Sequence, residues 1–250
     1  MIDLDLLARE LDEALFARRE IASLTKAHGE FDLVTAYRVQ ERGVALRLAR
    51  GEKIIGYKMG LTSAAKRAQM NLGVPIYGVL TDAMCVPGEL RVLDGVHPKI
   101  EPEIAFVTKR ELSGNVDHDQ AIDALEAVAP ALEILDSRFV GFKYFSLPDV
   151  VADNCSSWKF VLGPLQKARA TGGLRMRMSV DGKLAQEASS NDISGDPILS
   201  LLQLVAMLPH PLPAGSIVLA GGATVAEPLR PGMTVSLQVE ELGEMQVRAT

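Results

Sequence analysis

The feature that most constrains the fold of this chain is a series of short β-rich runs after Lys53, with few helical segments between them. Seven such runs are expected to be strands: residues 54–59, 100–107, 131–135, 160–162, 174–180, 217–220 and 235–239. A doubly wound parallel sheet needs a crossover helix between most of its strands. We therefore predict an α+β fold whose β-rich core is a mostly antiparallel or mixed sheet folded on itself.

Turn and cap signals punctuate this region. Asp181-Gly182, between two strand-like runs, indicates a tight hairpin. Three helices are expected here: residues 63–70, 119–128 and 196–208. Asp117 is a candidate cap for the second of these helices, and Pro197 suits the first turn of the third.

The first 52 residues have a different character, and we predict a helical arm at 1–52 ahead of a β-rich domain at 53–250. Four leucines recur at helical spacing and would keep one face of a first helix: Leu4, Leu7, Leu11 and Leu15. A second amphipathic pattern follows the break at His28-Gly29. The arm has no glycine-rich loop, so we interpret it as a lid, packing or assembly element.

Three carboxylates stand inside apolar runs. Glu101 and Glu103 lie in IEPEIAF at 100–106, and Glu133 lies in PALEIL at 130–135. Alternate side chains of a strand share a face, so Glu101 and Glu103 point the same way, with Cα atoms about 6 to 7 Å apart. Buried carboxylates need a metal or matched basic partners, and an all-carboxylate set favours Mg²⁺ or Mn²⁺ over zinc.

A competing interpretation places Glu101 and Glu103 on the wet face of an edge strand, where Pro102 fits because it has no N–H to donate. Glu133, flanked by apolar residues, favours the metal site.

Other polar groups are weaker candidates for a site. Lys58 lies in the strand-like segment GYKMGLT at 56–62, whose glycines permit close backbone approach, although an isolated lysine is ordinarily a solvated surface group. The polar loop DNCSS at 153–157 could bind a carboxylate or serve only as a turn. Gly221 and Gly222, in AGGAT at 220–224, could offer backbone N–H groups to an anion.

The composition narrows the class of partner. The chain has 250 residues and a formal net charge of -6 at pH 7, with no basic stripe for nucleic acid or for an anionic membrane. No apolar run reaches the roughly 18 residues of a spanning helix, and Cys85 and Cys155 fit a reducing cytoplasm. A small molecule is therefore the expected partner. Because 48% of the residues are hydrophobic, self-association into a homo-oligomer is also expected.

Five ordered segments give the chain a family resemblance: GYKMGLTS at 56–63, IEPEIAF at 100–106, PALEILDSRF at 130–139, VADNCSS at 151–157 and PAGSIVLAGGATVA at 213–226. Together they resemble the hydratase/decarboxylase family of meta-cleavage pathways for aromatic compounds, which is related to the fumarylacetoacetate hydrolase fold. The resemblance implies a β-roll or barrel-like core of the fumarylacetoacetate hydrolase C-terminal type. It implies Mg²⁺ or Mn²⁺ held by Glu101, Glu103 and Glu133. It also implies an active-site lysine at Lys58 and contact between Ser156 and the substrate carboxylate.

Two activities share this family scaffold, hydration of 2-oxopent-4-enoate and decarboxylation of 2-oxo-3-hexenedioate (4-oxalocrotonate). Where the hydratases carry a Pro-Asp-Phe/Tyr-Gly motif, this chain has Ile76 and Tyr77, which would border the substrate without an acid to activate water. The segment 140–154 also resembles the decarboxylase branch. We therefore expect decarboxylation to 2-hydroxypenta-2,4-dienoate (2-oxopent-4-enoate) and CO₂.

Two alternatives stay open. The chain could be a hydratase on the same fold, or a non-catalytic, metal-binding partner that stabilises a hydratase in a complex. The resemblance also implies a possible complex with the hydratase of the pathway, because the decarboxylases of this family are associated with their hydratases. Trp158 is larger than the family pattern suggests, which leaves the size of the pocket open.

Overall fold

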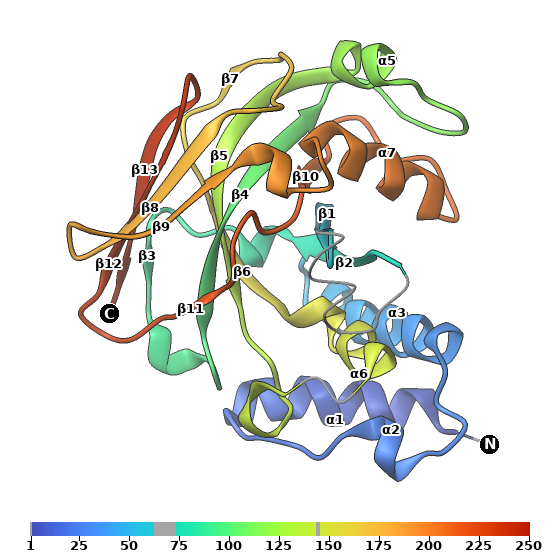
Figure 1. Ribbon diagram of the computed structural model, residues 1–250. Helices are drawn as coiled ribbons and strands as arrows, with labels where there is room; N and C mark the ends of the chain where they lie inside the picture. Colours follow the sequence, from blue (N-terminus) through green and yellow to red (C-terminus); the bar gives the residue numbers. More distant parts are fainter. Residues whose placement is uncertain (1, 63–73, 144–145) are drawn as a thin grey trace.

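The structure is a computed structural model that describes residues 2–62, 74–143 and 146–250. Two β-sheets form the body of the molecule (Figure 1). The larger sheet runs in the order β2-β1-β10-β4-β5-β6, with β11 on β4 and β7 on β5. Its strands are β1 (Ile54–Gly60), β2 (Ile76–Thr81), β4 (Lys99–Thr108), β5 (Leu125–Leu135), β6 (Ser157–Leu162), β7 (Gln166–Lys167), β10 (Ile217–Leu219) and β11 (Glu227–Pro228).

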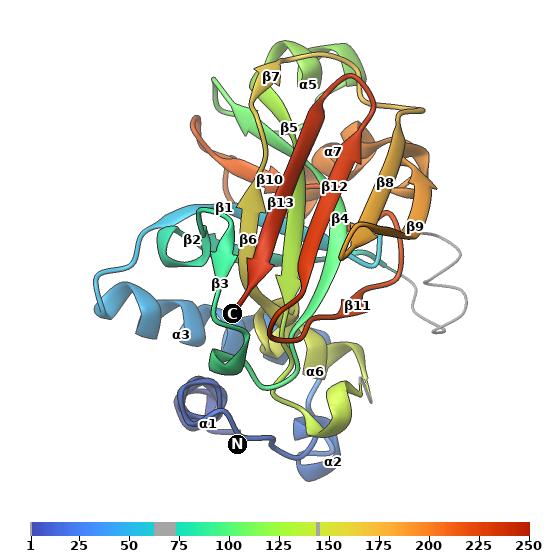
Figure 2. The same ribbon diagram turned by 90° about the vertical axis from the view of Figure 1, so that its left-hand side faces the viewer.

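The smaller sheet runs in the order β3-β13-β12-β8-β9 and lies against the larger one (Figure 2). Its strands are β3 (Glu89–Leu90), β8 (Arg175–Val180), β9 (Lys183–Ser189), β12 (Thr234–Val239) and β13 (Gly243–Ala249). In the described part of the chain, β1 pairs with β10 and β3 with β13 in parallel, and the other pairs are antiparallel. The predicted α+β fold with a mixed, mostly antiparallel β-rich core is therefore confirmed.

Most of the helices lie at the two ends of the sheets, and α7 (Pro197–Met207) packs on the core that the sheets share. The others are α1 (Leu4–Ala17), α2 (Leu24–Ala27), α3 (Leu33–Ala49), α5 (His118–Asp123) and α6 (Leu147–Ala152). Figures 1 and 2 show α1, α2, α3 and α6 gathered at one end, with α5 at the other. None of the helices in the described ranges is long and apolar enough to cross a membrane.

The N-terminal arm is helical as predicted, and it packs closely on the rest of the chain. Leu7 and Leu11 of α1 are buried in a hydrophobic cluster with Phe139 and with Val151 of α6. Arg18, in the left-handed conformation, caps the C-terminus of α1. The boundary between an arm at 1–52 and a β-rich domain at 53–250 stays a prediction, because this cluster joins the two segments.

The alternation of β4 decides which residues face the site. Ile100, Ile104 and Phe106 are fully buried in the cluster that joins the two sheets. Successive side chains of a strand point to opposite faces, so Glu101 and Glu103 turn away from that cluster. The apolar positions of one strand thus fix the direction of the acids between them.

Two local predictions are confirmed. Asp181 and Gly182 both have positive φ, of 50° and 76°, and join β8 to β9 in a tight hairpin, as the primed hairpin turns require. Asp196 caps α7 by accepting the N–H of Ile198 at 2.9 Å, and Pro197 occupies its first turn.

The helix predicted over 119–128 is partly wrong. Asp117 caps α5 as expected, but the helix ends at Asp123 and β5 begins at Leu125. Pairing with β4 places Leu125 and Val128 in fully buried positions, which outweighs their local helical preference. The helix predicted over 63–70 lies outside the described residues, and the sequence patterns did not predict β2 or α6.

Candidate active site

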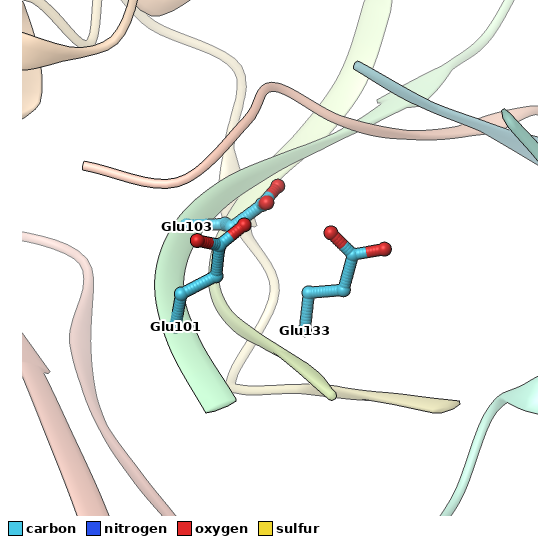
Figure 3. A group of neighbouring side chains, drawn as sticks. All are labelled: Glu101, Glu103 and Glu133. Atoms are coloured by element: carbon cyan, nitrogen blue, oxygen red, sulfur yellow. The ribbon is translucent and has the colours of Figure 1, made fainter. Parts of the chain in front are cut away.

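Three carboxylates converge where β4 and β5 pair. Glu101 is the cross-strand partner of Glu133, and Glu103 follows two residues later on the same face of β4. One oxygen atom from each side chain lies within 4.8 Å of the other two. Figure 3 shows the three side chains projecting from neighbouring strands toward a common point.

Glu103 is fully buried, and one of its carboxylate oxygens lacks a hydrogen-bond partner among the described residues. Burial raises the pKa of Glu103 well above its usual range, and the neighbouring charges of Glu133 and Glu101 raise it further. Its Oε2 accepts the backbone N–H of Gly221 at 2.9 Å. Among the described residues its Oε1 has no hydrogen-bond partner, so a buried oxygen is left over.

Lys58, on β1, reaches this cluster from across the sheet. Its Nζ lies 2.9 Å from Glu133 Oε2, and only 3% of the lysine side chain is exposed. Burial by itself lowers the pKa of Lys58, but the charge of Glu133 and the other acidic groups outweighs burial and raises it. The hydroxyl of Ser157 donates to the other oxygen of Glu133 at 3.0 Å. Lys58 is therefore a fixed ammonium and not a solvated surface group.

The donor set fits a hard divalent cation. Three carboxylates face one ammonium, which leaves two negative charges for a divalent ion to neutralise. Oxygen-only ligation suits Mg²⁺ or Mn²⁺. The unpartnered Oε1 of buried Glu103 is the atom that such an ion would satisfy.

Two glycines keep the backbone close to these acids. A Cβ at Gly222 would lie 2.4 Å from the carboxyl carbon of Glu101. Gly221 has a φ of +108°, and a Cβ there would lie 2.4 Å from Thr62 Oγ1. Gly221 does not offer its N–H to a free anion, because that group binds Glu103.

The carboxylate cluster adjoins a cavity of about 410 Å³. Its lining includes Lys58, Glu101 and Gly222 together with the apolar side chains of Ile76 and Leu61. Trp158 is buried in the core and is not among the described residues that line the cavity. It therefore does not determine the size of the cavity.

Two predicted substrate contacts are not brought to this cavity. Tyr77 follows Ile76 in β2 and so points to the opposite face of the strand, where its ring stacks on Tyr37 with centroids 4.9 Å apart. Ser156 is fully buried and is absent from the described lining. Ser157, the next residue along, is the serine that contacts an acid of the cluster.

Residues 56–250 match the model of the fumarylacetoacetate (FAA) hydrolase C-terminal family. The chain belongs to this family. A 4-oxalocrotonate decarboxylase from a Pseudomonas species is 44% identical to it, over 98% of this chain and 97% of the relative. The solved structure of 4-oxalocrotonate decarboxylase from Pseudomonas putida G7, complexed with magnesium and adipate, superposes with a TM-score of 0.95 at 34% identity. That match covers 99% of this chain and 97% of the other.

Hydratases of the FAA hydrolase family are also similar to this chain. A 2-hydroxyhexa-2,4-dienoate hydratase from Comamonas testosteroni is 32% identical over 97% of this chain and 96% of the relative. The predicted family, fold and decarboxylase type of enzyme are thus confirmed, and the predicted divalent cation agrees with the magnesium in the P. putida structure.

The polar loop at 153–157 forms a turn beside this site, which is one of the two roles that the sequence left open for it. Asn154, Cys155 and Ser156 all have positive φ, between 47° and 57°. The Asn154 side chain holds this turn against β2 by bonding both the N–H and the carbonyl oxygen of Val79, at 2.8 and 2.9 Å. The sequence did not indicate three successive positive φ angles in this turn, although Asn is among the residue types that tolerate this conformation best.

Proposed function

We propose that this chain is a metal-dependent decarboxylase that converts 2-oxo-3-hexenedioate (4-oxalocrotonate) to 2-hydroxypenta-2,4-dienoate and CO₂ in the catabolism of aromatic compounds. The observation that carries the proposal is the carboxylate cluster with its buried ammonium, opening on a cavity with apolar walls at Ile76 and Leu61. The similarity to 4-oxalocrotonate decarboxylases over the full chain supports it.

Glu101, Glu103 and Glu133 would hold the Mg²⁺ or Mn²⁺ ion. When bound, such an ion acts as a Lewis acid that favours negative charge on the 2-oxo oxygen of a substrate. Ser157 fixes one oxygen of Glu133 and Gly221 fixes one oxygen of Glu103, so two of the carboxylates are held in place before an ion arrives.

The reaction moves one electron pair along the substrate. The bond between C5 and C6 breaks, and C6 leaves as CO₂. The pair forms a C4–C5 double bond, the former C3–C4 double bond becomes a C2–C3 double bond, and the 2-oxo oxygen becomes an oxyanion. Protonation of that oxygen gives 2-hydroxypenta-2,4-dienoate.

Lys58 is the group of the chain best placed to stabilise the negative charge that develops on the 2-oxo oxygen. Its ammonium already lies against Glu133 and lines the cavity. A fixed cation in a water-poor site stabilises an oxyanion more than a ketone, and this difference lowers the barrier.

The apolar cavity wall favours decarboxylation over hydration. Ile76 is 2% exposed and lines the cavity. The family resemblance aligns Ile76 with the aspartate of the hydratase motif. A hydratase needs a group that activates water, whereas an apolar side chain helps to exclude it. The hydratase relatives keep hydration of 2-hydroxypenta-2,4-dienoate as the second candidate.

One experiment separates the candidates. The purified protein is incubated with 2-oxo-3-hexenedioate and, separately, with 2-hydroxypenta-2,4-dienoate, while CO₂ release and water addition are followed. We expect CO₂ release that stops after chelation with EDTA and returns with Mg²⁺ or Mn²⁺. Water addition without CO₂ release would establish the hydratase. Absence of both activities would favour a non-catalytic partner of a hydratase.

Three associations accompany the proposal. The partner is a small 2-oxo dicarboxylate, with no nucleic acid and no membrane. We propose that the chain forms a homo-oligomer in the cytoplasm. We also propose that it binds the hydratase of the pathway, because the dienol product is unstable in water and would be passed directly to that enzyme. Comparing the mass of the purified protein with and without the hydratase tests both associations.

A further inference from the structure

A second lysine lies in line with the acids of the cluster. Lys99 begins β4, and the alternation of the strand puts Lys99, Glu101 and Glu103 on one face. Lys99 and Glu101 both line the cavity. Two residues of strand separate their Cα atoms by about 6 to 7 Å. Along the face of β4 that borders the cavity, the ammonium of Lys99 therefore comes two residues before the carboxylate of Glu101.

Lys99 differs from Lys58 in its surroundings. Lys58 is neutralised by Glu133 at 2.9 Å. The ammonium of Lys99 instead lies 4.1 Å from the ring centroid of Phe142, which also lines the cavity. Within the described ranges, no carboxylate lies at ion-pair distance from Lys99. An aromatic face orients an ammonium but does not neutralise it, so Lys99 is a half-buried cation that can accept an anion from the cavity.

We propose that Lys99 binds the distal carboxylate of a linear 2-oxo dicarboxylate whose 2-oxo acid end lies at the glutamate cluster. This inference rests on the proposed function and makes Lys99 the residue that selects dicarboxylates over monocarboxylates. The lengths agree. A six-carbon chain has five carbon–carbon bonds of about 1.5 Å and spans roughly 6 to 7 Å when extended, close to the separation along β4.

The chemistry of the proposed reaction defines the role of this contact. The distal carboxylate is anionic in the bound substrate and leaves as neutral CO₂, so its attraction to Lys99 weakens toward the transition state. Such a contact strengthens substrate binding more than it accelerates the bond-breaking step. Lys99 therefore determines specificity, and its loss raises KM more than it lowers kcat.

Binding of unreactive ligands tests this role without turnover. The Mg²⁺-loaded protein is titrated by calorimetry with 2-oxoadipate, which carries the distal carboxylate, and with 2-oxohexanoate, which does not. We expect wild type to bind 2-oxoadipate at least about tenfold more tightly, because a hydrogen bond between charged groups is stronger than one between neutral groups.

Three variants complete the test. Lys99→Met should abolish the preference by weakening 2-oxoadipate binding alone, and Lys99→Arg should restore it. Lys109→Met, which removes an exposed lysine just after β4, should leave both affinities unchanged. Thermal melting of each variant verifies that it is folded.

The outcomes separate this proposal from the proposed function. An unchanged preference in Lys99→Met would overturn the role of Lys99, and so would an equal loss for both ligands, because that result would place Lys99 at the shared 2-oxo acid end. If neither ligand bound the wild-type protein in a Mg²⁺-dependent manner, the proposed function would be overturned together with the role of Lys99.

Discussion

Lys58 and Glu133 form a buried ion pair between strands that are not neighbours in the sheet. The Nζ of Lys58 on β1 lies 2.9 Å from Oε2 of Glu133 on β5, and β10 and β4 lie between the two strands. Both side chains are almost completely buried. Removing one member of such a pair leaves the other without compensation in a medium of low dielectric constant.

The first prediction concerns Lys58→Met. We expect kcat for CO₂ release at saturating Mg²⁺ to fall at least about a hundredfold, as when a single oxyanion-stabilising donor is lost. Lys53→Met is the matched control, because Lys53 is exposed just ahead of β1. Near-normal turnover in a folded Lys58→Met protein would remove the assigned role.

The second prediction gives Glu103→Gln opposite effects on the metal-free and metal-loaded protein. Burial and the neighbouring acids raise the pKa of Glu103, so its charged form is unfavourable without a cation. The neutral amide should therefore raise the melting temperature of the metal-free protein while removing most of the stabilisation by Mg²⁺. Melting curves with and without Mg²⁺ measure both effects.

Glu126→Gln, at an exposed position of β5, is the control for the second prediction and should change neither curve. A Glu103→Gln protein that Mg²⁺ stabilised as strongly as wild type would show that this carboxylate does not hold the ion.

The acids of the site could be predicted from the sequence because they interrupt apolar runs. The alternation in β4 fixes the shared direction of Glu101 and Glu103 without any knowledge of other strands. That Glu133 lies opposite Glu101 depends on the register between β4 and β5, which the sequence patterns do not determine. The apolar neighbours of Glu133 favoured it as the third acid and the family resemblance implied the same, but neither supplied this register.

The remainder of the site depends on contacts that no local pattern encodes. Ile76 and Tyr77 were expected to border the substrate together, but adjacent residues of a strand face opposite sides. Because β2 was not predicted, this consequence was missed. Ser157 reaches Glu133 only because a turn with positive φ at residues 154–156 precedes β6. Lys99 follows the same alternation as the acids and could have been found from it.

The third prediction tests the space beside Glu101. In Gly222→Ala, the new Cβ would meet the Glu101 carboxyl group at 2.4 Å, so that side chain must move. We expect Mg²⁺ affinity to fall at least about tenfold, a typical loss when a metal ligand is misoriented. Calorimetric titration with Mg²⁺ measures it.

Gly43→Ala is the matched control, since a Cβ at this position of α3 meets nothing within 4 Å. Alanine should even stabilise this helix slightly. Equal Mg²⁺ affinity in Gly222→Ala and wild type would contradict the placement of the ion beside Glu101.

The fourth prediction concerns the pH dependence of stability at the contact between α5 and α7. His118 Nε2 lies 2.9 Å from Asp196 Oδ2, and the hydrogen bond to Asp196, with a smaller contribution from Asp119, raises the pKa of His118. A raised folded-state pKa means that the native state binds the proton more tightly than the unfolded chain does. The resulting stabilisation is fully present below the unfolded pKa of about 6.5 and is lost as the pH rises through the higher folded value.

A double-mutant cycle of His118→Gln and Asp196→Asn measures this coupling. Asparagine is chosen at position 196 because it can still cap α7. The pair is partly exposed, so we expect a coupling of about 0.2 to 1 kcal/mol near pH 5.5 and almost none near pH 9. Denaturant unfolding of the four proteins at both pH values gives the coupling directly. A coupling that grew with pH would mean that neutral histidine, and not the imidazolium ion, is the form that Asp196 stabilises.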